Sequence, residues 1–158
     1  MTPDDWTAVA RIYRQGIDTR NATFETEVPT WESWDRTHLP TPRLVARRGS
    51  EVLGWAALSP VSDRCAYAGV AENSVYVDAS ARGQGLGREL LGTLVARAES
   101  AGIWTVQTGI FPENASSVRV HEACGFRVVG VRRRIGRLEG RWRDVLFMER
   151  RSQTVGAD

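Results

Sequence analysis

Residues 72–91 read Glu-Asn-Ser-Val-Tyr-Val-Asp-Ala-Ser-Ala-Arg-Gly-Gln-Gly-Leu-Gly-Arg-Glu-Leu-Leu and lead into a helical pattern that continues to Ser100. The β-branched and aromatic run Ser74–Val77 predicts a strand. After it, apolar residues recur at the spacing of an amphipathic helix. These positions are Leu86, Leu90, Leu91, Leu94, Val95 and Ala98. A glycine-rich turn separates the strand from the helix, so the segment predicts a strand-turn-helix unit.

The glycine-rich turn is suited to binding an anion. Gly83, Gly85 and Gly87 permit conformations and close approaches that a side chain would obstruct. The helix that begins near Gly85 adds unpaired N–H groups and the partial positive charge of its first turn. Arg82 and Arg88 flank the turn with full positive charges that suit phosphate oxygens. A diphosphate group would fit such a turn.

Three kinds of diphosphate-binding loop can be compared with this turn. The phosphate loop of nucleotide hydrolases needs G-x-x-x-x-G-K-[ST], which occurs nowhere in the chain. The dinucleotide fingerprint G-x-G-x-x-G would need glycine at position 88, where arginine stands, and an acidic residue about 20 positions further on. The segment Arg82-Gly-Gln-Gly-Leu-Gly87 instead resembles the R/Q-x-x-G-x-G/A signature of the GNAT acyltransferases, whose loop holds the pyrophosphate of acetyl-coenzyme A (acetyl-CoA). A turn without any ligand is the remaining alternative.

Length and composition indicate one globular domain. A chain of 158 residues can bury a substantial core, and 42% apolar and 25% charged residues are typical of soluble proteins. The net charge of +2 gives no case for a nucleic-acid partner. No apolar run approaches membrane-spanning length and no signal region opens the chain, so we expect a cytoplasmic protein without a membrane partner. Cys65 and Cys124 have no metal-ligand spacing, so no metal is expected.

The remaining patterns predict a mixed α/β (α+β) fold. Pro3 opens an N-terminal helix, and Thr30 caps a second helix that ends by Pro40. Further predicted elements are an antiparallel hairpin at 43–47 and 52–58, a polar connection at 63–71, a strand at 104–111, a helix at 115–123, and strands at 127–131 and 145–148 with an arginine-rich loop between them. The two strands that flank the long helix would be parallel, within a mostly antiparallel sheet flanked by helices. Residues 1–151 would form the single domain and residues 152–158 a flexible tail.

A second segment resembles the same family. Asn114-Ala-Ser-Ser-Val-Arg-Val-His121-Glu-Ala-Cys-Gly125-Phe126 is similar to the pattern N-x-x-[AS]-x-x-x-Y-E-x-x-G-F of GNAT enzymes. The resemblance implies that Asn114 and Ser117 bond the pantetheine and phosphate arm of the coenzyme. In many members the tyrosine of this pattern protonates the departing thiolate. His121 stands in its place.

A histidine at this position, together with Glu72, resembles the phosphinothricin N-acetyltransferase branch, which is similar to relatives that acetylate arsinothricin. Further branch-like pieces are Asn21-Ala-Thr-Phe-Glu25, Gly54-Trp-Ala56, Arg64-Cys-Ala-Tyr67 and Gly140-Arg-Trp-Arg-Asp144. The resemblance spans nearly the whole chain, except that the first helix leaves no room for the family's first strand. It implies the GNAT fold, acetyl-CoA as co-substrate, and a homodimer, since similar members are often homodimers.

The resemblance also implies roles at the coenzyme site. Glu72 would take the proton from the acceptor amine, directly or through one water. His121, with an ordinary pKa of about 6.5, would share that role or donate a proton to sulfur, and these options stay open. The thioester carbonyl would bond an N–H around Val77, with pantetheine beside the strand like an added strand. The predicted coenzyme-binding residues are Val75, Tyr76, Val77, Arg82, Gly83, Gln84, Gly85, Leu86, Gly87, Arg88, Asn114 and Ser117.

An anionic acceptor needs fixed cations, and guanidinium suits a two-oxygen anion. Arg64 is therefore the predicted partner of a phosphinate or carboxylate, with Tyr67, Phe24 and Glu25 shaping the pocket. The predicted reaction is transfer of the acetyl group of acetyl-CoA to the α-amine of a small glutamate analogue, such as phosphinothricin, methionine sulfoximine or arsinothricin. Transfer would be direct, in a ternary complex. The alternatives are another amino acid, a polyamine or a protein N-terminus as acceptor, and a coenzyme A sensor without turnover.

Overall fold

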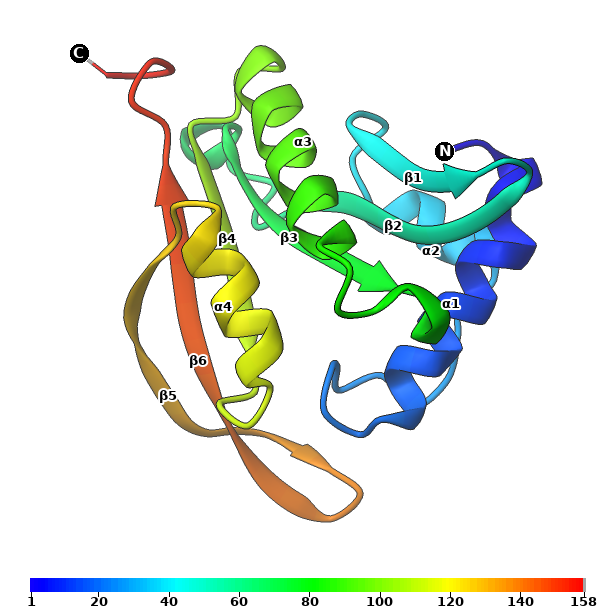
Figure 1. The fold of residues 1–158 in the computed structure, drawn as a ribbon. Coiled ribbons are helices and arrows are strands. Elements are labelled where there is room, and N and C mark those ends of the chain that lie inside the picture. Colours follow the sequence, from blue (N-terminus) through cyan, green and yellow to red (C-terminus); the bar gives the residue numbers. More distant parts are fainter. Residues whose placement is uncertain (158) are drawn as a thin grey trace.

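The computed structural model describes residues 1–157, which form an open six-stranded sheet with helices on both faces (Figure 1). The strand order is β1-β2-β3-β4-β6-β5. The strands are β1 (Arg43–Arg48), β2 (Glu51–Pro60), β3 (Val70–Val77), β4 (Thr105–Ile110), β5 (Arg127–Leu138) and β6 (Arg141–Arg151). The helices are α1 (Trp6–Asp18), α2 (Trp31–Thr37), α3 (Leu86–Ser100) and α4 (Ala115–Ala123). The predicted α/β architecture is confirmed.

The sheet divides in the middle, between β3 and β4. These two strands are parallel and joined by the crossover helix α3, but they pair only where residues 70–72 meet residues 105–107. Beyond this point β3 continues in antiparallel pairing with β2 alone, while β4 continues with β6 alone. Figure 1 shows the two strands diverging below α3. One edge of β3, from Asn73 to Val77, therefore presents main-chain N–H and C=O groups that no neighbouring strand pairs.

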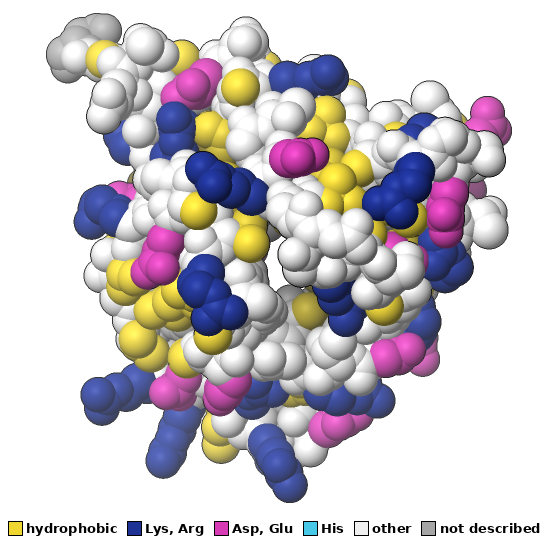
Figure 2. Space-filling view, in the orientation of Figure 1, with side chains coloured by type: hydrophobic (Ala, Val, Ile, Leu, Met, Phe, Trp, Pro, Cys, Tyr) yellow, Lys and Arg dark blue, Asp and Glu magenta, His cyan; other side chains and the backbone are white. Residues whose placement is uncertain are grey.

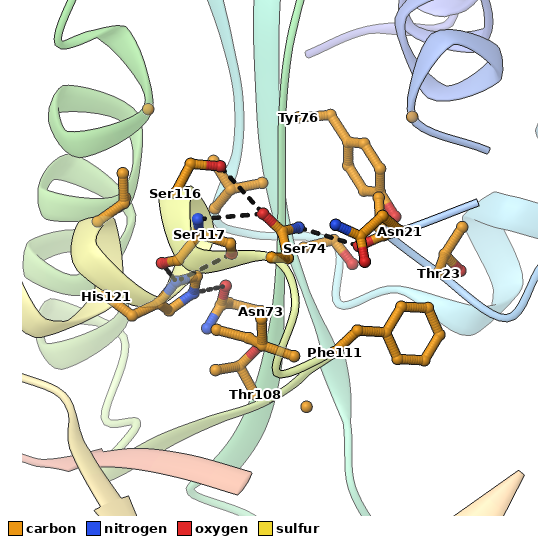
Figure 3. A pocket seen from close by; sticks show the side chains of 18 of the residues that line it. Asn21, Thr23, Asn73, Ser74, Tyr76, Thr108, Phe111, Ser116, Ser117 and His121 are labelled. Atoms are coloured by element: carbon orange, nitrogen blue, oxygen red, sulfur yellow. Dashed lines mark hydrogen bonds between the residues drawn. The ribbon is translucent and has the colours of Figure 1, made fainter. Parts of the chain in front are cut away.

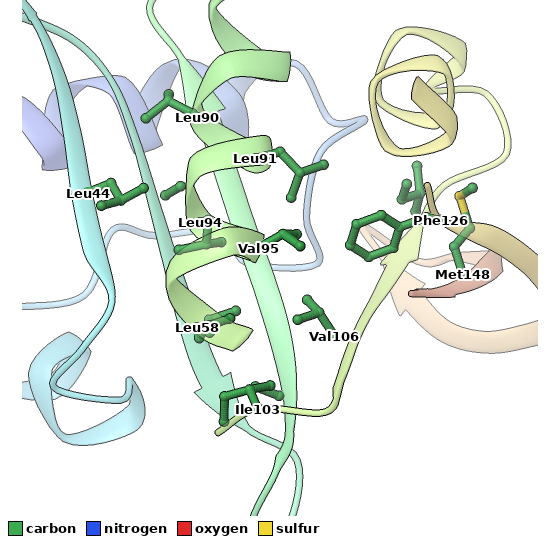
Figure 4. Packing of buried hydrophobic residues seen from close by; sticks show 14 residues of the cluster. Leu44, Leu58, Leu90, Leu91, Leu94, Val95, Ile103, Val106, Phe126 and Met148 are labelled. Atoms are coloured by element: carbon green, nitrogen blue, oxygen red, sulfur yellow. The ribbon is translucent and has the colours of Figure 1, made fainter. Parts of the chain in front are cut away.

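Two hydrophobic clusters hold the helices against the sheet. Under α3, Leu91 and Leu94 are fully buried against Leu58 of β2, in a cluster that reaches Met148 of β6 (Figure 4). Under α1 and α2, the second cluster is built around Trp34 and other buried aromatic and aliphatic side chains. The long amphipathic helix is thus fixed on one face of the sheet, which places its first turn at the mouth of the division between β3 and β4.

The N-terminal region follows the prediction. A 3₁₀ turn at Pro3–Asp5 precedes α1, and the Thr2 N–H donates to Asp5 Oδ2 at 2.7 Å. No strand precedes α1 within residues 1–5. Thr30 caps α2, because its Oγ1 accepts from the Ser33 N–H at 3.3 Å. Over residues 1–157, no helix has the length and apolarity that crossing a bilayer requires.

The predicted arginine-rich loop between the last two strands is wrong. Strands β5 and β6 extend into this segment as a long hairpin that closes at Glu139 and Gly140, both with positive φ. Two consecutive positive φ angles match the tight turn that hairpins favour, but Glu-Gly is a weaker signal for it than Asn-Gly. Many of these strand positions are exposed arginines, and the guanidinium groups of some of them lie over aromatic rings: that of Arg132 is 4.2 Å from the Phe147 ring centre.

The predicted connection at 63–71 is shorter than expected, because Val70 and Ala71 already belong to β3. The assignment of residues 152–158 to a flexible tail stays a prediction, and Asp158 lies outside the described residues. Within the described part, the Ser152 N–H donates to the main-chain oxygen of Trp104 at 2.8 Å. Arg151 donates to the main-chain oxygen of Val155 at 2.7 Å, so the start of this segment is tied to the sheet.

Candidate active site

A cleft of about 1130 Å³ occupies the division between β3 and β4. Figure 2 shows its opening near the middle of the face that Figure 1 presents. One wall is β3 with the glycine-rich turn. The other is α4 with the end of β4 and parts of β5 and β6, and the loop after α1 closes the far end. The cleft therefore joins the two segments that sequence analysis selected, residues 72–88 and 114–121.

The glycine-rich turn adopts the backbone that its glycines permit. Gly83 and Gly85 have φ of 74° and 85°, in the left-handed region that favours glycine. A Cβ at either position would meet nothing within 4 Å, so the backbone conformation, and not space, demands glycine there. No side chain caps the N-terminus of α3. The N–H groups of the first turn at Leu86 and Gly87 thus face a cleft in which an anion can accept from them.

A buried aspartate anchors this turn to α1. Asp78 directly follows β3, and its Oδ1 accepts from the Ser80 N–H at 2.9 Å and the Ser80 hydroxyl at 2.7 Å. Its Oδ2 accepts from Gln15 at 3.1 Å and is paired with Arg11. Burial raises the pKa of Asp78, but these hydrogen bonds outweigh burial and hold it well below its ordinary value. Sequence analysis did not identify Asp78, because its partners on α1 are more than 60 positions away.

Most predicted coenzyme-binding residues line the cleft. They are Val75, Tyr76, Val77, Arg82, Gly83, Gly85, Leu86, Gly87, Arg88, Asn114 and Ser117. Gln84 does not: its amide donates to the main-chain oxygen of Ser80 at 3.0 Å and its oxygen accepts from Arg48, outside the cleft. The ring of Tyr76 turns toward α1 and stacks on Trp55, with 4.8 Å between ring centres. Burial raises the pKa of Tyr76 far above its ordinary value, so the phenol stays neutral.

His121 lies in the α4 wall with both ring nitrogens hydrogen-bonded (Figure 3). Nδ1 is 2.8 Å from the main-chain oxygen of Ser117, and Nε2 is 3.1 Å from Oδ1 of Asn73. The side chain is 4% exposed. Burial lowers the pKa of the imidazole, and the bond to Ser117 opposes this in part. Asn73 was not predicted as a site residue, since a polar residue in a strand usually points to solvent.

Glu72 lies where the pairing between β3 and β4 ends. Its partner in β4 is Gln107, whose side-chain amide donates to Glu72 Oε2 at 3.1 Å. The Glu72 side chain is exposed, whereas its neighbour Asn73 is buried against His121. Since side chains alternate along a strand, Glu72 and Asn73 point to opposite faces of the sheet. Both faces open into the cleft because the sheet divides there, so Glu72 and His121 line the same cavity from different sides.

The loop after α1 is held across the far end of the cleft by contacts that are distant in sequence. The Asn114 amide donates to the main-chain oxygen of Asn21 at 3.1 Å, while its own oxygen caps α4. Arg143 donates to the main-chain oxygen of Arg20 at 3.0 Å. The Phe24 ring packs on Phe111 with 4.8 Å between centres. The residues in these contacts are between about 87 and more than 120 positions apart along the chain, so no local sequence pattern predicts them.

The predicted acceptor residues separate into two groups. Phe24 and Glu25 line the cleft. Arg64 and Tyr67 do not: they lie on the exposed connection before β3, with the guanidinium 5.5 Å from the Tyr67 ring centre. Apart from Arg82 and Arg88 of the turn, the arginines that line the cleft are Arg119 of α4 and Arg132 of β5. Arg132 was missed because its segment was predicted to be a loop.

The cysteines take no part in the cleft. Cys65 is exposed and Cys124 is half-buried, and both are free thiols. Within residues 1–157, no group of three or more His, Cys, Asp and Glu side chains is arranged to hold a metal ion.

Comparison with known proteins gives consistent results. The profile of the Acetyltransferase (GNAT) family matches residues 6–126. A phosphinothricin N-acetyltransferase of Alcaligenes faecalis is 38% identical over 155 residues, which cover 93% of this chain and 78% of that protein. An L-methionine sulfoximine/L-methionine sulfone acetyltransferase of Pseudomonas aeruginosa is 31% identical, over 92% of this chain and 88% of that protein. The structure of a GNAT superfamily phosphinothricin acetyltransferase from Sinorhizobium meliloti, in complex with acetyl-CoA, is similar with a TM-score of 0.89 and 32% identity, covering 100% of this chain and 89% of that chain.

Proposed function

Since the chain belongs to the GNAT family and is an acetyl-CoA-dependent N-acetyltransferase, we propose that it acetylates the α-amine of a small glutamate-analogue amino acid. Phosphinothricin, methionine sulfoximine and arsinothricin represent this acceptor class. One observation carries the proposal: the sheet divides beside Glu72, and the resulting cleft joins an anion-binding turn to a carboxylate and an imidazole. The relatives described above act on acceptors of this class.

The co-substrate is proposed to bind along the β3 wall. Its diphosphate would accept hydrogen bonds from the N–H groups at the start of α3, with Arg82 and Arg88 supplying charge. Its pantetheine arm would pair with the free edge of β3, as an added strand does. This proposal is supported by the uncapped helix end and by the unpaired main chain of residues 73–77. The thioester, at the opposite end of that arm from the diphosphate, would then lie toward Asn73, within the same cleft as Glu72 and farther along β3 than the Val77 position that sequence analysis predicted.

Direct transfer requires an unprotonated amine, since only its lone pair can attack the thioester carbon. Glu72 is proposed to accept the proton of the acceptor ammonium. The C–N bond then forms, the C–S bond breaks, and the departing thiolate of coenzyme A takes up the second proton that the nitrogen loses as the amide forms. An exposed carboxylate held by Gln107 on the cleft wall supports this role for Glu72. Much of the rate would come from holding both substrates in reacting geometry.

The acceptor's acidic group is proposed to meet an arginine. Arg64 is the partner that sequence analysis predicts, whereas the cleft itself offers Arg119 and Arg132. Replacing each by glutamine separates them. Replacing the true partner should raise the acceptor KM about tenfold or more, because a charge-assisted hydrogen bond to the acceptor is lost. The acetyl-CoA KM should stay unchanged. Equal changes in both KM values would count against either assignment.

A homodimer is proposed for the active form. Strand β5 is the edge of the sheet, and three of its apolar side chains, Val128, Val129 and Val131, are about half exposed. Such an edge favours pairing with another chain. Sedimentation equilibrium would give a dimer mass, and Val129→Lys should shift the mass toward the monomer. A wild-type monomer at micromolar concentration would contradict this part of the proposal.

An acceptor screen tests the function. Release of free thiol from acetyl-CoA would be followed with phosphinothricin, methionine sulfoximine, arsinothricin, the common amino acids and a polyamine. We expect the glutamate analogues to have the highest kcat/KM, with the product acetylated at nitrogen by mass spectrometry. A higher kcat/KM for a polyamine would contradict the proposed acceptor class but would still support acetyl transfer from acetyl-CoA.

A sensor without turnover is the alternative from a different class of function. Glu25 and Glu72 both line the cleft, so a cationic ligand in place of a substrate is chemically possible. Titration calorimetry that shows acetyl-CoA binding, combined with no thiol release for any amine tested, would favour the sensor. Turnover with any amine would exclude it.

A further inference from the structure

The imidazole of His121 is part of a row of groups that crosses the cleft floor from α4 to β4. The row begins at the main-chain oxygen of Ser117, 2.8 Å from Nδ1. It continues from Nε2 to Oδ1 of Asn73 at 3.1 Å, and from Nδ2 of Asn73 to the main-chain oxygen of Gln107 at 3.2 Å. Both ends of the row are carbonyl oxygens, which accept hydrogen bonds and never donate them. Figure 3 shows the imidazole between Ser117 and Asn73.

Counting hydrogens along this row gives a definite result. Three contacts need three hydrogens. The Asn73 amide supplies one, toward Gln107, and a neutral imidazole supplies one more. At one ring nitrogen, two acceptor atoms then face each other across about 3 Å without a hydrogen between them, which is repulsive. A doubly protonated His121 supplies the missing hydrogen and satisfies the whole row.

Other arrangements of the same groups do not solve the count. Rotating the Asn73 amide by a half turn would give His121 a donor, but it would set Oδ1 of Asn73 against the main-chain oxygen of Gln107. The Ser117 hydroxyl is 3.5 Å from Nδ1, too far for a hydrogen bond that could replace the 2.8 Å contact to the main-chain oxygen.

Among the residues that the structure describes, none of the groups in contact with the His121 ring is charged. The groups against it are Ser117 on α4, Asn73 on β3, and Phe126, whose ring centre is 5.0 Å away. The neighbouring charged residues along the same two elements are Glu72 on β3 and both Arg119 and Glu122 on α4. Within residues 1–157 neither of these carboxylates hydrogen-bonds the ring, and Glu72 points to the other face of β3. Burial lowers the pKa of His121 and so opposes the charged imidazolium. The hydrogen-bond acceptors at both ring nitrogens favour the charged form.

We propose that Asn73 is a positioning residue that orients the His121 ring and keeps both of its nitrogens protonated. Asn73 can do this because it follows Glu72, the last residue of β3 that pairs with β4. Its amide fills the hydrogen bond that the Gln107 carbonyl loses where the strands diverge, and its oxygen turns to α4. The significance of the resulting positive charge rests on the proposed function: it lies in the cleft into which the thiolate would leave.

The test is the titration of His121 in the full-length protein. The chain has two histidines, so selective ¹⁵N-histidine labelling gives two sets of ring signals, and His38 serves as the internal reference. Asn73→Leu removes the acceptor without opening the site to water. We expect it to lower the His121 pKa by about one pH unit, a tenfold weaker affinity for the proton. Asn73→Asp keeps an acceptor and adds negative charge, so it should raise the same pKa above that of the wild type.

An unchanged His121 pKa in both variants, with His38 unchanged as proof of folding, would overturn the inference. So would a rise in Asn73→Leu. Should Asn73→Leu fail to fold, Asn73→Asp still decides, because a His121 pKa at or below the wild-type value would contradict the proposal. A purely structural role for Asn73 would reduce thermal stability but leave the His121 pKa where it is.

This readout is independent of turnover. If no amine is acetylated and the His121 pKa still shifts as stated, the proposed function fails while the role of Asn73 stands. If acetylation occurs and the pKa does not shift, only the role of Asn73 fails. With an active acceptor in hand, the pH dependence of kcat/KM adds a second check, since the limb that reports His121 should move by the same amount as the NMR titration.

Discussion

The two ends of the cleft are built in different ways. The end proposed for the coenzyme is a continuous segment, residues 81–88, which lines the cleft except at Gln84 and includes the uncapped first turn of α3. The acceptor end is assembled from side chains of the loop after α1, the end of β4, the start of α4 and the β5–β6 hairpin. Asn21, Phe24, Asn114 and Arg143 meet there only because the chain is folded.

This difference explains which part of the site a sequence reveals. A main-chain anion site depends on glycines at fixed spacing, and that spacing is visible in the sequence. A side-chain pocket depends on contacts between distant segments, whose residues have no common local pattern. The acceptor end is therefore where related chains can change specificity without disturbing coenzyme binding.

The largest effect is expected at Glu72, between the two ends. Glu72→Gln should reduce kcat/KM by about 10²- to 10⁴-fold, since a general base contributes about that much. Acetyl-CoA affinity should stay unchanged, because the Glu72 side chain is not among the groups proposed to hold the coenzyme. Steady-state kinetics and calorimetry would measure both. Glu27→Gln is the matched control, since Glu27 is an exposed acid of the loop after α1 that does not line the cleft. Wild-type kcat/KM in Glu72→Gln would remove the base assignment.

A substitution of Asp78 tests whether the glycine-rich turn depends on contacts with the distant helix α1. Because hydrogen bonds lower its folded pKa below the unfolded value of about 3.9, Asp78 adds stability above that pH and loses it as pH falls through the folded pKa. Asp78→Asn should therefore cost about 2 kcal/mol of unfolding free energy near pH 7. The difference from wild type should shrink toward pH 2, as urea denaturation at both pH values would show. A difference that is independent of pH would contradict the assignment.

Comparing alanine variants of two glycines with similar backbone conformations measures how much the glycine-rich turn contributes to coenzyme binding. Gly85 and Gly49 both have positive φ, and a Cβ at either would meet nothing within 4 Å. Alanine at each position therefore costs about 1 kcal/mol of backbone strain. Only Gly85→Ala should also raise the acetyl-CoA KM, by about tenfold, because only that turn faces the cleft. Equal KM values in the two variants would show that the turn does not hold the coenzyme.

The smallest effect is expected at the acceptor end. Arg143→Leu removes the hydrogen bonds that hold the main-chain oxygen of Arg20 and Oδ1 of Asn21. Loss of about 1 kcal/mol of positioning should raise the acceptor KM about fivefold and leave the acetyl-CoA KM unchanged. Arg141→Leu, at the exposed tip of the same hairpin, is the control. A rise in the acetyl-CoA KM alone would reverse the assignment of the two ends.

The sequence predicted the elements whose signals are local. Helix α4 was predicted from residue 115 because Asn114 is an N-cap, and α3 from its apolar spacing. The two last strands were predicted at 127–131 and 145–148, but their extension into residues 132–144 was missed because the arginines there resemble a solvated loop. These arginines form strands through pairing and through stacking on rings such as Phe147. Glu72 and His121 were predicted by resemblance and do share one cleft. Asn73 was not, because its partners are set by the point at which β3 and β4 diverge.

A crystal structure of the protein with bound coenzyme A tests the central claim most directly. We predict that the diphosphate lies against the N–H groups of residues 83–87 and that pantetheine pairs with the free edge of β3 between Asn73 and Val77. Its sulfur should then lie in the cleft shared by Glu72 and His121. A coenzyme bound elsewhere, with the turn and the edge of β3 unoccupied, would contradict the account.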